Sequence, residues 1–211
     1  MSLTPQAGIM NIALYEGGKS SIAGHSDVLK LSSNENPLGP PPAAMAAIAQ
    51  AASEVHRYPS TDHAELRAAI GKTYGLAPEQ IICGVGSDEV LQFVCQAYAG
   101  AGDEIIYTEH GISMYPILAH MAGATPVQVA ETERVVSVDT ILAAVTERTR
   151  VVMLANPANP TGTMLPDGEL ERLARSLPAT VILVIDGAYA EYAEGYDGGA
   201  GLVAELPNML M

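Results

Sequence analysis

Short apolar runs alternate along the chain with longer segments in which apolar residues recur at helical spacing. The runs are predicted to be strands, at residues 81–83, 104–107, 126–129, 151–154 and 181–185. The segments between them are predicted to be helices, at residues 87–99, 113–121, 140–146 and 167–176. Because strands that are covered on both faces lose their polar positions, this alternation predicts an α/β fold with a mostly parallel, doubly wound sheet and helices on both faces.

The first third of the chain has a different pattern. Residues 1–36 are polar and rich in turn residues, and they are interpreted as an N-terminal arm. Prolines at 37 and 40–42 keep the following loop extended until a helix begins at Pro41 or Pro42, and a second helix is predicted at residues 64–74. Residues 37–211 are then expected to form one large domain that is incomplete at its C-terminal end.

Charge and composition narrow the possible partners. The 211 residues include 24 acidic and 10 basic side chains, which gives a formal charge of −14 and argues against nucleic acid and anionic membranes as partners. No apolar run reaches membrane-spanning length, and the N-terminus does not read as a secretory leader, so a cytoplasmic location is expected. Cys83 and Cys95 are expected to be buried and reduced, and neither has metal-ligand spacing around it.

A glycine turn joins the first predicted strand to its helix. In Gly84-Val85-Gly86-Ser87-Asp88-Glu89 the two glycines let the backbone approach a phosphate, and the helix that starts at Ser87 points free N–H groups toward it. A plain turn with a serine cap explains the same residues equally well. A dinucleotide site is disfavoured, because Glu89 occupies the position of the third glycine.

Polar residues follow the last two long strands. Two Asn-Pro steps, at Asn156 and Asn159, constrain the loop after residues 151–154, and a cis bond is expected at one of them, before Pro160. Asp186 ends the next strand, where a carboxylate needs a partner such as a pyridinium nitrogen, a helix N-terminus or an arginine. Taken one at a time, a proline-rich connector and a structural aspartate remain the simpler explanations.

Taken together, the motifs resemble a known family. Asn-Glu-Asn-Pro-Leu-Gly, Arg-Tyr-Pro, Gly-x-Gly-Ser-Asp-Glu, Met-Tyr-Pro, Asn-Pro-x-Asn-Pro-Thr-Gly and Asp-x-Ala-Tyr occur here in the order seen in fold-type I, class I/II aminotransferases that use pyridoxal 5′-phosphate (PLP). The histidinol-phosphate aminotransferase branch is the most similar. The resemblance implies reversible amino transfer from histidinol phosphate to 2-oxoglutarate in histidine biosynthesis, by a homodimer that acts on small amino-acid and oxo-acid substrates.

The same resemblance implies individual roles. Gly86, Ser87 and Asp88 would hold the cofactor phosphate, together with Tyr58 from the neighbouring subunit. Asn159 and Tyr189 would bind the phenolic oxygen of the cofactor, and Asp186 would pair with the pyridine nitrogen. Asp186 and Tyr189 are thus the candidate catalytic residues, Tyr115 is a further cofactor-binding candidate, and Tyr15 and Asn36 would border the substrate.

Two positions depart from the family pattern. Ile112 stands where the family usually stacks an aromatic residue on the cofactor ring, which leaves Tyr115 or His110 as alternative neighbours of the ring. The lysine that forms the Schiff base with PLP is expected beyond Asp186, whereas Lys19, Lys30 and Lys72 all precede it. The sequence is therefore expected to be part of a longer enzyme.

Other functions fit the pattern less closely. An aminotransferase for aromatic or other amino acids, or a phospho-amino-acid decarboxylase of the same fold, would share most of these motifs. A non-catalytic PLP-fold binding or assembly module would keep the fold without the lysine.

Overall fold

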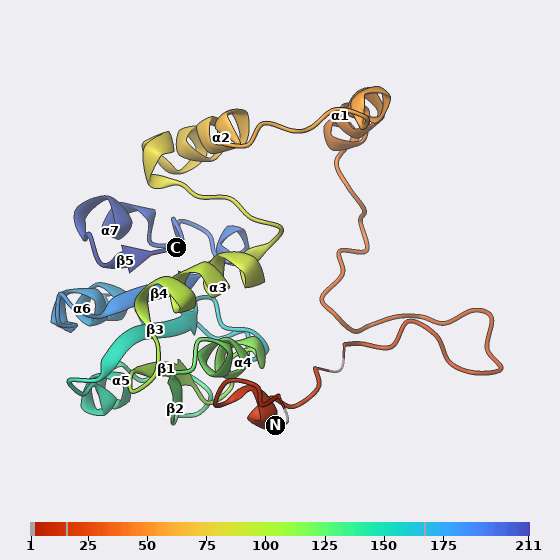
Figure 1. Cartoon of the computed structure of the whole chain (residues 1–211). Coiled ribbons are helices and arrows are strands. Elements are labelled where there is room, and N and C mark those ends of the chain that lie inside the picture. Colours follow the sequence, from red (N-terminus) through yellow and green to blue (C-terminus); the bar gives the residue numbers. More distant parts are fainter. Residues whose placement is uncertain (1–2, 16, 167) are drawn as a thin grey trace. The chain divides into compact units, whose positions relative to one another are not determined.

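A computed structural model describes residues 3–15, 17–166 and 168–211. Figure 1 shows a central sheet with helices packed around it, preceded by an extended N-terminal segment. Four short 3-10 helices, at Ile9–Asn11, Ala52–Glu54, Pro78–Gln80 and Ala190–Tyr192, accompany the main elements. The main elements are α1 (Pro42–Ala51), α2 (Ala64–Tyr74), α3 (Ser87–Tyr98), β1 (Glu104–Thr108), α4 (Met114–Met121), β2 (Thr125–Val129), α5 (Val138–Ala144), β3 (Thr149–Ala155), α6 (Glu169–Ser176), β4 (Ile182–Asp186), α7 (Ala200–Glu205) and β5 (Met209–Leu210).

The sheet has five strands in the order β2-β1-β3-β4-β5, and every neighbouring pair is parallel. The predicted parallel α/β sheet is therefore confirmed. The chain moves outward from β1 to β2 and then returns to the other side of β1 to form β3. In sheets of this order, ligands bind beyond the carboxyl ends of the strands where the chain reverses direction, here between β1 and β3.

Alternation along the strands divides the core into two layers. Ile106, Val152 and Leu154 point to one face, where they pack with residues of α5, α6 and α7. Ile105 and Met153 point to the other face, against α3 and α4. Because successive side chains of a strand point to opposite faces, a continuous apolar run serves both layers, which explains the pattern of the sequence.

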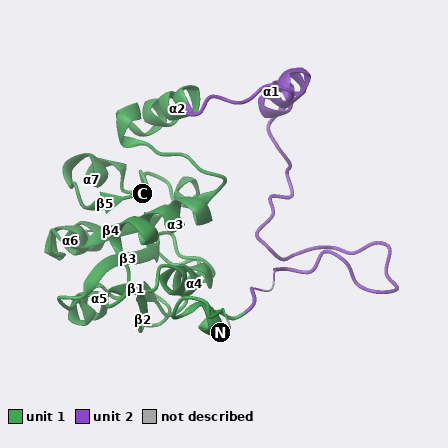
Figure 2. Ribbon diagram, viewed as in Figure 1, with its two compact units in different colours: residues 1–13, 64–211 green, residues 14–63 purple. Residues whose placement is uncertain are grey.

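The chain divides into two compact units (Figure 2): residues 1–13 with 64–211, and residues 14–63. The first unit contains the whole sheet. The second contains α1, which begins at Pro42 and has no buried residue. Large apolar side chains of this unit are exposed, including Leu29, Leu31 and Ile48.

Several local predictions were wrong. Residues 81–83 form no strand in the described part of the chain, because they have no neighbouring strand to pair with, and the Ile82 side chain is 60% exposed. The helix predicted at 140–146 runs from Val138 to Ala144 instead, since the Ser137 hydroxyl caps it by accepting from the Thr140 N–H at 3.3 Å. The predicted start of α6 at Asp167 lies outside the described residues.

Both cysteines are free, as expected, but only Cys95 is buried, and Cys83 is partly exposed. Over residues 3–15, 17–166 and 168–211, no helix combines the length and the apolar character needed to cross a membrane. The same ranges contain no group of three or more His, Cys, Asp or Glu side chains arranged to hold a metal ion.

Candidate functional site

The candidate site lies at the carboxyl edge of the sheet, beyond β1, β3 and β4. Ala155 and Asp186 are partners in the register of β3 and β4, so the two turns that follow these strands start side by side. The Asn156 N–H also donates to the Asp186 carbonyl oxygen at 3.1 Å. The Asn-Pro loop and the Asp-x-Ala-Tyr turn are thereby fixed to each other at their bases.

Asp186 is held in place on both carboxylate oxygens. Its Oδ2 accepts a hydrogen bond from the Tyr115 hydroxyl at 3.2 Å, and its Oδ1 accepts one from the Ala188 N–H at 3.1 Å. A carboxylate offers about four acceptor positions, so two donors leave capacity for a further N–H. The residue is half-buried, and a cationic ring nitrogen is the kind of partner that would complete its bonding.

Tyr115 lies in the first turn of α4 and is completely buried. Burial raises the pKa of its hydroxyl strongly, and the negative charges of Asp186 and Asp88 add to the effect. The phenol therefore stays a neutral hydrogen-bond donor across the physiological pH range. Asp88, at the start of α3, is thus close enough to Tyr115 for its charge to affect the pKa of the tyrosine.

The start of α3 is exposed and shaped by glycine. Gly86 precedes the helix with φ +106°, and a β-carbon built on it would meet open space. Ser87 and Asp88 follow in the exposed first turn, where backbone N–H groups have no partner within the helix. Glu89 stabilises this turn, since its carboxylate accepts from the Val85 N–H at 2.8 Å. Glu89 therefore has a structural role, consistent with the rejection of a dinucleotide fingerprint.

The two asparagines of the Asn-Pro loop differ in their roles. Asn156 is buried, and its side-chain oxygen accepts from the Leu165 N–H at 3.0 Å. Asn159 is only partly buried and lies further along the loop. The peptide bonds before Pro157 and Pro160 are both cis, so the expectation of one before Pro160 is confirmed. Asn156 is thus a structural residue, and Asn159 remains the ligand-binding candidate.

Tyr189 follows the same turn as Asp186, directly before the 3-10 helix Ala190–Tyr192. Its ring packs at a tilt against that of Tyr192, with ring centroids 6.2 Å apart. Tyr192 is itself exposed, so the pair forms a small aromatic surface on the loop after β4.

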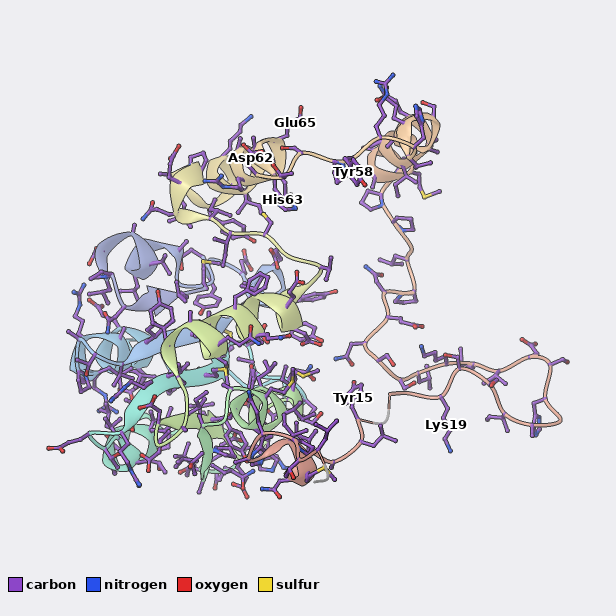
Figure 3. The ribbon with its side chains drawn as sticks, in the orientation of Figure 1. Tyr15, Lys19, Tyr58, Asp62, His63 and Glu65 are labelled. Atoms are coloured by element: carbon purple, nitrogen blue, oxygen red, sulfur yellow. The ribbon has the colours of Figure 1, made fainter. Side chains whose placement is uncertain are left out.

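Three predicted site residues belong to the other unit, residues 14–63. Tyr15 and Tyr58 extend from its chain in Figure 3, and both are exposed, Tyr58 completely. Asn36 folds back on its own loop, with its side-chain oxygen accepting from the Leu38 N–H at 2.9 Å. Their roles stay predictions.

Two contacts near the site were not anticipated. The Tyr115–Asp186 bond spans 71 residues, and His110 contacts Glu131 across 21 residues. Glu131 carries no motif, and the only signal for it is an acidic residue just beyond a predicted strand. Ile112, which replaces an aromatic residue of the family pattern, is partly buried against the layer that contains Tyr115.

The structure is a parallel α/β fold in which a carboxylate ends one strand of the sheet and a glycine turn precedes α3. Residues 26–211 match the family described as aminotransferase class I and II, so this chain belongs to that family.

Sequence relatives are similar over nearly the whole chain. A histidinol-phosphate aminotransferase from Ruegeria pomeroyi is 69% identical over 208 residues, which are 99% of this chain and 58% of the relative. One from Jannaschia sp. is 59% identical over 209 residues, with the same coverage of both chains. The chain thus spans somewhat more than half the length of the curated relatives it matches.

Solved structures agree with this assignment. Histidinol-phosphate aminotransferase from Sinorhizobium meliloti, in complex with pyridoxal-5′-phosphate, has a TM-score of 0.78 and 29% identity, covering 84% of this chain and 49% of that one. A mutant aspartate aminotransferase from Thermus thermophilus has a TM-score of 0.73 and 26% identity, covering 81% of this chain and 48% of that one.

Proposed function

We propose that this chain supplies the cofactor-holding part of a PLP-dependent aminotransferase that converts histidinol phosphate and 2-oxoglutarate to imidazole-acetol phosphate and glutamate. The observation that carries the proposal is Asp186, a strand-end carboxylate fixed by two donors and still able to accept a third. The 69% identity to a histidinol-phosphate aminotransferase supports the choice of substrate.

The described residues fit the cofactor. Asp186 offers an anionic acceptor to the ring nitrogen, and Gly86 leaves open space at an exposed helix start, where N–H groups attract a phosphate. Bound PLP supplies an electron sink for the carbanion that forms when the substrate loses its α-proton. Asp186 keeps the ring nitrogen protonated, which makes the electron sink effective.

The remaining roles follow from the family assignment. Ser87 and Asp88 contribute to the phosphate site with Gly86, and Asn159 and Tyr189 donate to the phenolic oxygen. We assign residues 37–211 to the large domain and residues 1–36 to the arm. Tyr58 reaches the phosphate in a neighbouring subunit, so the active form is a homodimer, and Tyr15 and Asn36 border the substrate. We place this enzyme in the cytoplasm. The lysine that binds the cofactor covalently comes from sequence outside these 211 residues.

Activity assays of the complete gene product test the proposed choice of substrate. Histidinol phosphate is expected to be preferred over phenylalanine by at least about a hundredfold in kcat/KM, because a phosphate-binding site left empty loses several polar contacts. The reverse preference would indicate an aromatic aminotransferase, and release of carbon dioxide would indicate a decarboxylase. If the complete protein shows neither a visible absorbance band with PLP nor transamination, it is a non-catalytic module.

A further inference from the structure

The connection between β2 and α5, residues 130–137, contacts both loops that flank the candidate site. It contains none of the residues assigned to cofactor or substrate. One of its contacts reaches the β1–α4 loop, which includes Ile112 and leads to Tyr115. Another reaches the Asn-Pro loop, which includes Asn159.

The first contact is centred on Glu131. Its Oε2 lies 2.8 Å from the His110 Nδ1, and its Oε1 accepts from the His110 N–H at 3.2 Å. In return, the Glu131 N–H donates to the Glu109 Oε2 at 3.2 Å. The Glu131 side chain is only 3% exposed, whereas that of His110 is 39% exposed. A buried carboxylate with several bonds to one turn restricts that turn more than a surface ion pair does.

The restricted turn leads directly into the site. The Gly111 N–H donates to the Thr108 carbonyl oxygen at 2.9 Å, and the Tyr115 N–H donates to the Ile112 carbonyl oxygen at 3.1 Å. The loop is therefore bonded at Glu131, at the end of β1 and at the start of α4. A shift at His110 would be transmitted to Ile112 and to the Tyr115 hydroxyl that holds Asp186.

The second contact comes from the turn at Thr132–Val135. Its ends exchange hydrogen bonds of 3.0 and 2.9 Å, and Glu133 and Arg134 both have positive φ, +51° and +66°. Two successive non-glycine residues in this conformation are strained, and such strain persists only where surrounding contacts enforce it.

A further hydrogen bond joins this turn to the Asn-Pro loop. The Thr163 hydroxyl donates to the Arg134 carbonyl oxygen at 2.7 Å, and Thr161 and Thr163 share a further bond of 2.8 Å between their hydroxyl oxygens. The Ala158 N–H donates to the Thr163 carbonyl oxygen at 2.8 Å, which brings the restraint next to Asn159.

We propose that the β2–α5 connection is a positioning element for the cofactor site, acting through its own Glu131 and through Thr163 of the Asn-Pro loop, which are the positioning residues. It fixes the loop of Ile112 and Tyr115 relative to the loop of Asn159, so that the groups around the ring keep one arrangement. This inference rests on the proposed function and extends it to residues outside the family motifs.

The test uses the complete, PLP-loaded enzyme and three readouts: PLP affinity, the induced circular dichroism of bound PLP, and kcat against KM. Glu131→Ala removes both side-chain bonds to His110 and is expected to weaken PLP binding by about tenfold, because part of their free energy is lost from the arrangement of the site. It should also reduce the induced dichroism at saturating PLP by at least about half and lower kcat more than it raises KM, since misplaced groups impair the chemical step. Glu131→Gln, which keeps an oxygen for the His110 N–H, should restore part of each signal.

Glu133→Ala is the matched control. It removes the same charge from the same connection without touching His110, and all three readouts should stay within about twofold of the parent. Thr163→Val, which removes the hydroxyl that donates to Arg134 and bonds to Thr161, should reproduce the dichroism loss, and it decides the question if Glu131→Ala does not fold.

Unchanged dichroism and PLP affinity in folded Glu131→Ala, or in folded Thr163→Val, would overturn the positioning role. So would equal losses in Glu133→Ala. A parent enzyme that binds no PLP would instead refute the proposed function, so the two failures are distinguishable.

Discussion

The buried Tyr115 hydroxyl donates a hydrogen bond to the Asp186 carboxylate at 3.2 Å, joining the first turn of α4 to the end of β4. The two residues are 71 positions apart and meet because β1, which leads into α4, and β4 are neighbours of β3 on either side. Burial and two nearby carboxylates raise the pKa of the tyrosine, so it remains a donor. The orientation of Asp186 thus depends on a core residue.

Tyr115→Phe tests that dependence. The substitution removes the hydroxyl and leaves the packing volume nearly unchanged, while Asp186 keeps its bond from the Ala188 N–H. We expect the free energy of unfolding to fall by about 1 kcal/mol and PLP affinity to fall by about fivefold, because one bond to a charged group is lost. Urea unfolding and absorbance titration with PLP measure both. Tyr107→Phe, on β1, is the control, and an equal loss of PLP affinity there would contradict the role of Tyr115.

Gly111→Ala is expected to disturb the same tyrosine by packing alone. A β-carbon at Gly111 would lie 2.9 Å from Cδ2 of Tyr115 and 3.1 Å from the Thr108 carbonyl oxygen. Because the Tyr115 ring is fully buried and cannot move aside, overpacking should cost about 1–3 kcal/mol of unfolding free energy. Gly100→Ala, where a β-carbon meets open space, should have little effect in the same urea titration. Similar losses in both variants would mean that Tyr115 is not the obstacle.

The two asparagines of the Asn-Pro loop should separate stability from cofactor binding. Asn156→Ala leaves the buried Leu165 N–H without its acceptor, which should lower the unfolding free energy by about 1–3 kcal/mol. Asn159→Ala should lower stability less, because Asn159 is less buried, and should weaken PLP binding more. Urea unfolding and PLP titration of both variants form the comparison, and the opposite ranking would assign the ligand role to Asn156.

The sequence predicted the positions of those site residues that are determined by the stretch of chain directly before them. The positions of Asp186 and Asn159 could be predicted because each comes at or just after the end of a continuous apolar run, and these strand ends lie at one edge of a parallel sheet, while their roles as ligands stay predictions. The Tyr115–Asp186 and His110–Glu131 contacts could not, since they depend on strand order and loop packing that no local pattern encodes.

The errors in the fold have the same origin. Residues 81–83 have strand-like composition, but a strand needs a paired neighbour, and apolar character alone does not provide one. The helix α7 was not predicted because it is short and contains Gly201, a poor helix former, although packing buries Ala200. Tertiary contacts decided both cases.

Stability above neutral pH should depend on Cys95, whose thiol is buried on α3. Burial raises its pKa from the ordinary value of 9.0 to about 11. The unfolded chain therefore loses this proton from about pH 9, whereas the folded chain loses it only near pH 11. The contribution of the thiol to the free energy of unfolding is fully present below pH 9 and is lost between pH 9 and pH 11. Two pKa units correspond to about 2–3 kcal/mol of unfolding free energy.

Urea unfolding from pH 8 to 11, under reducing conditions, measures the decline. Cys95→Ala should be less stable at pH 8, because it leaves a small cavity, but should lose less stability as the pH rises. Cys83→Ala, at the partly exposed cysteine before α3, should keep the slope of the parent. Buried tyrosines such as Tyr115 also have raised pKa values and are unchanged in both variants, so the difference in slope isolates the Cys95 thiol. Parallel pH profiles for Cys95→Ala and the parent would show that this thiol ionises alike in the folded and unfolded chains.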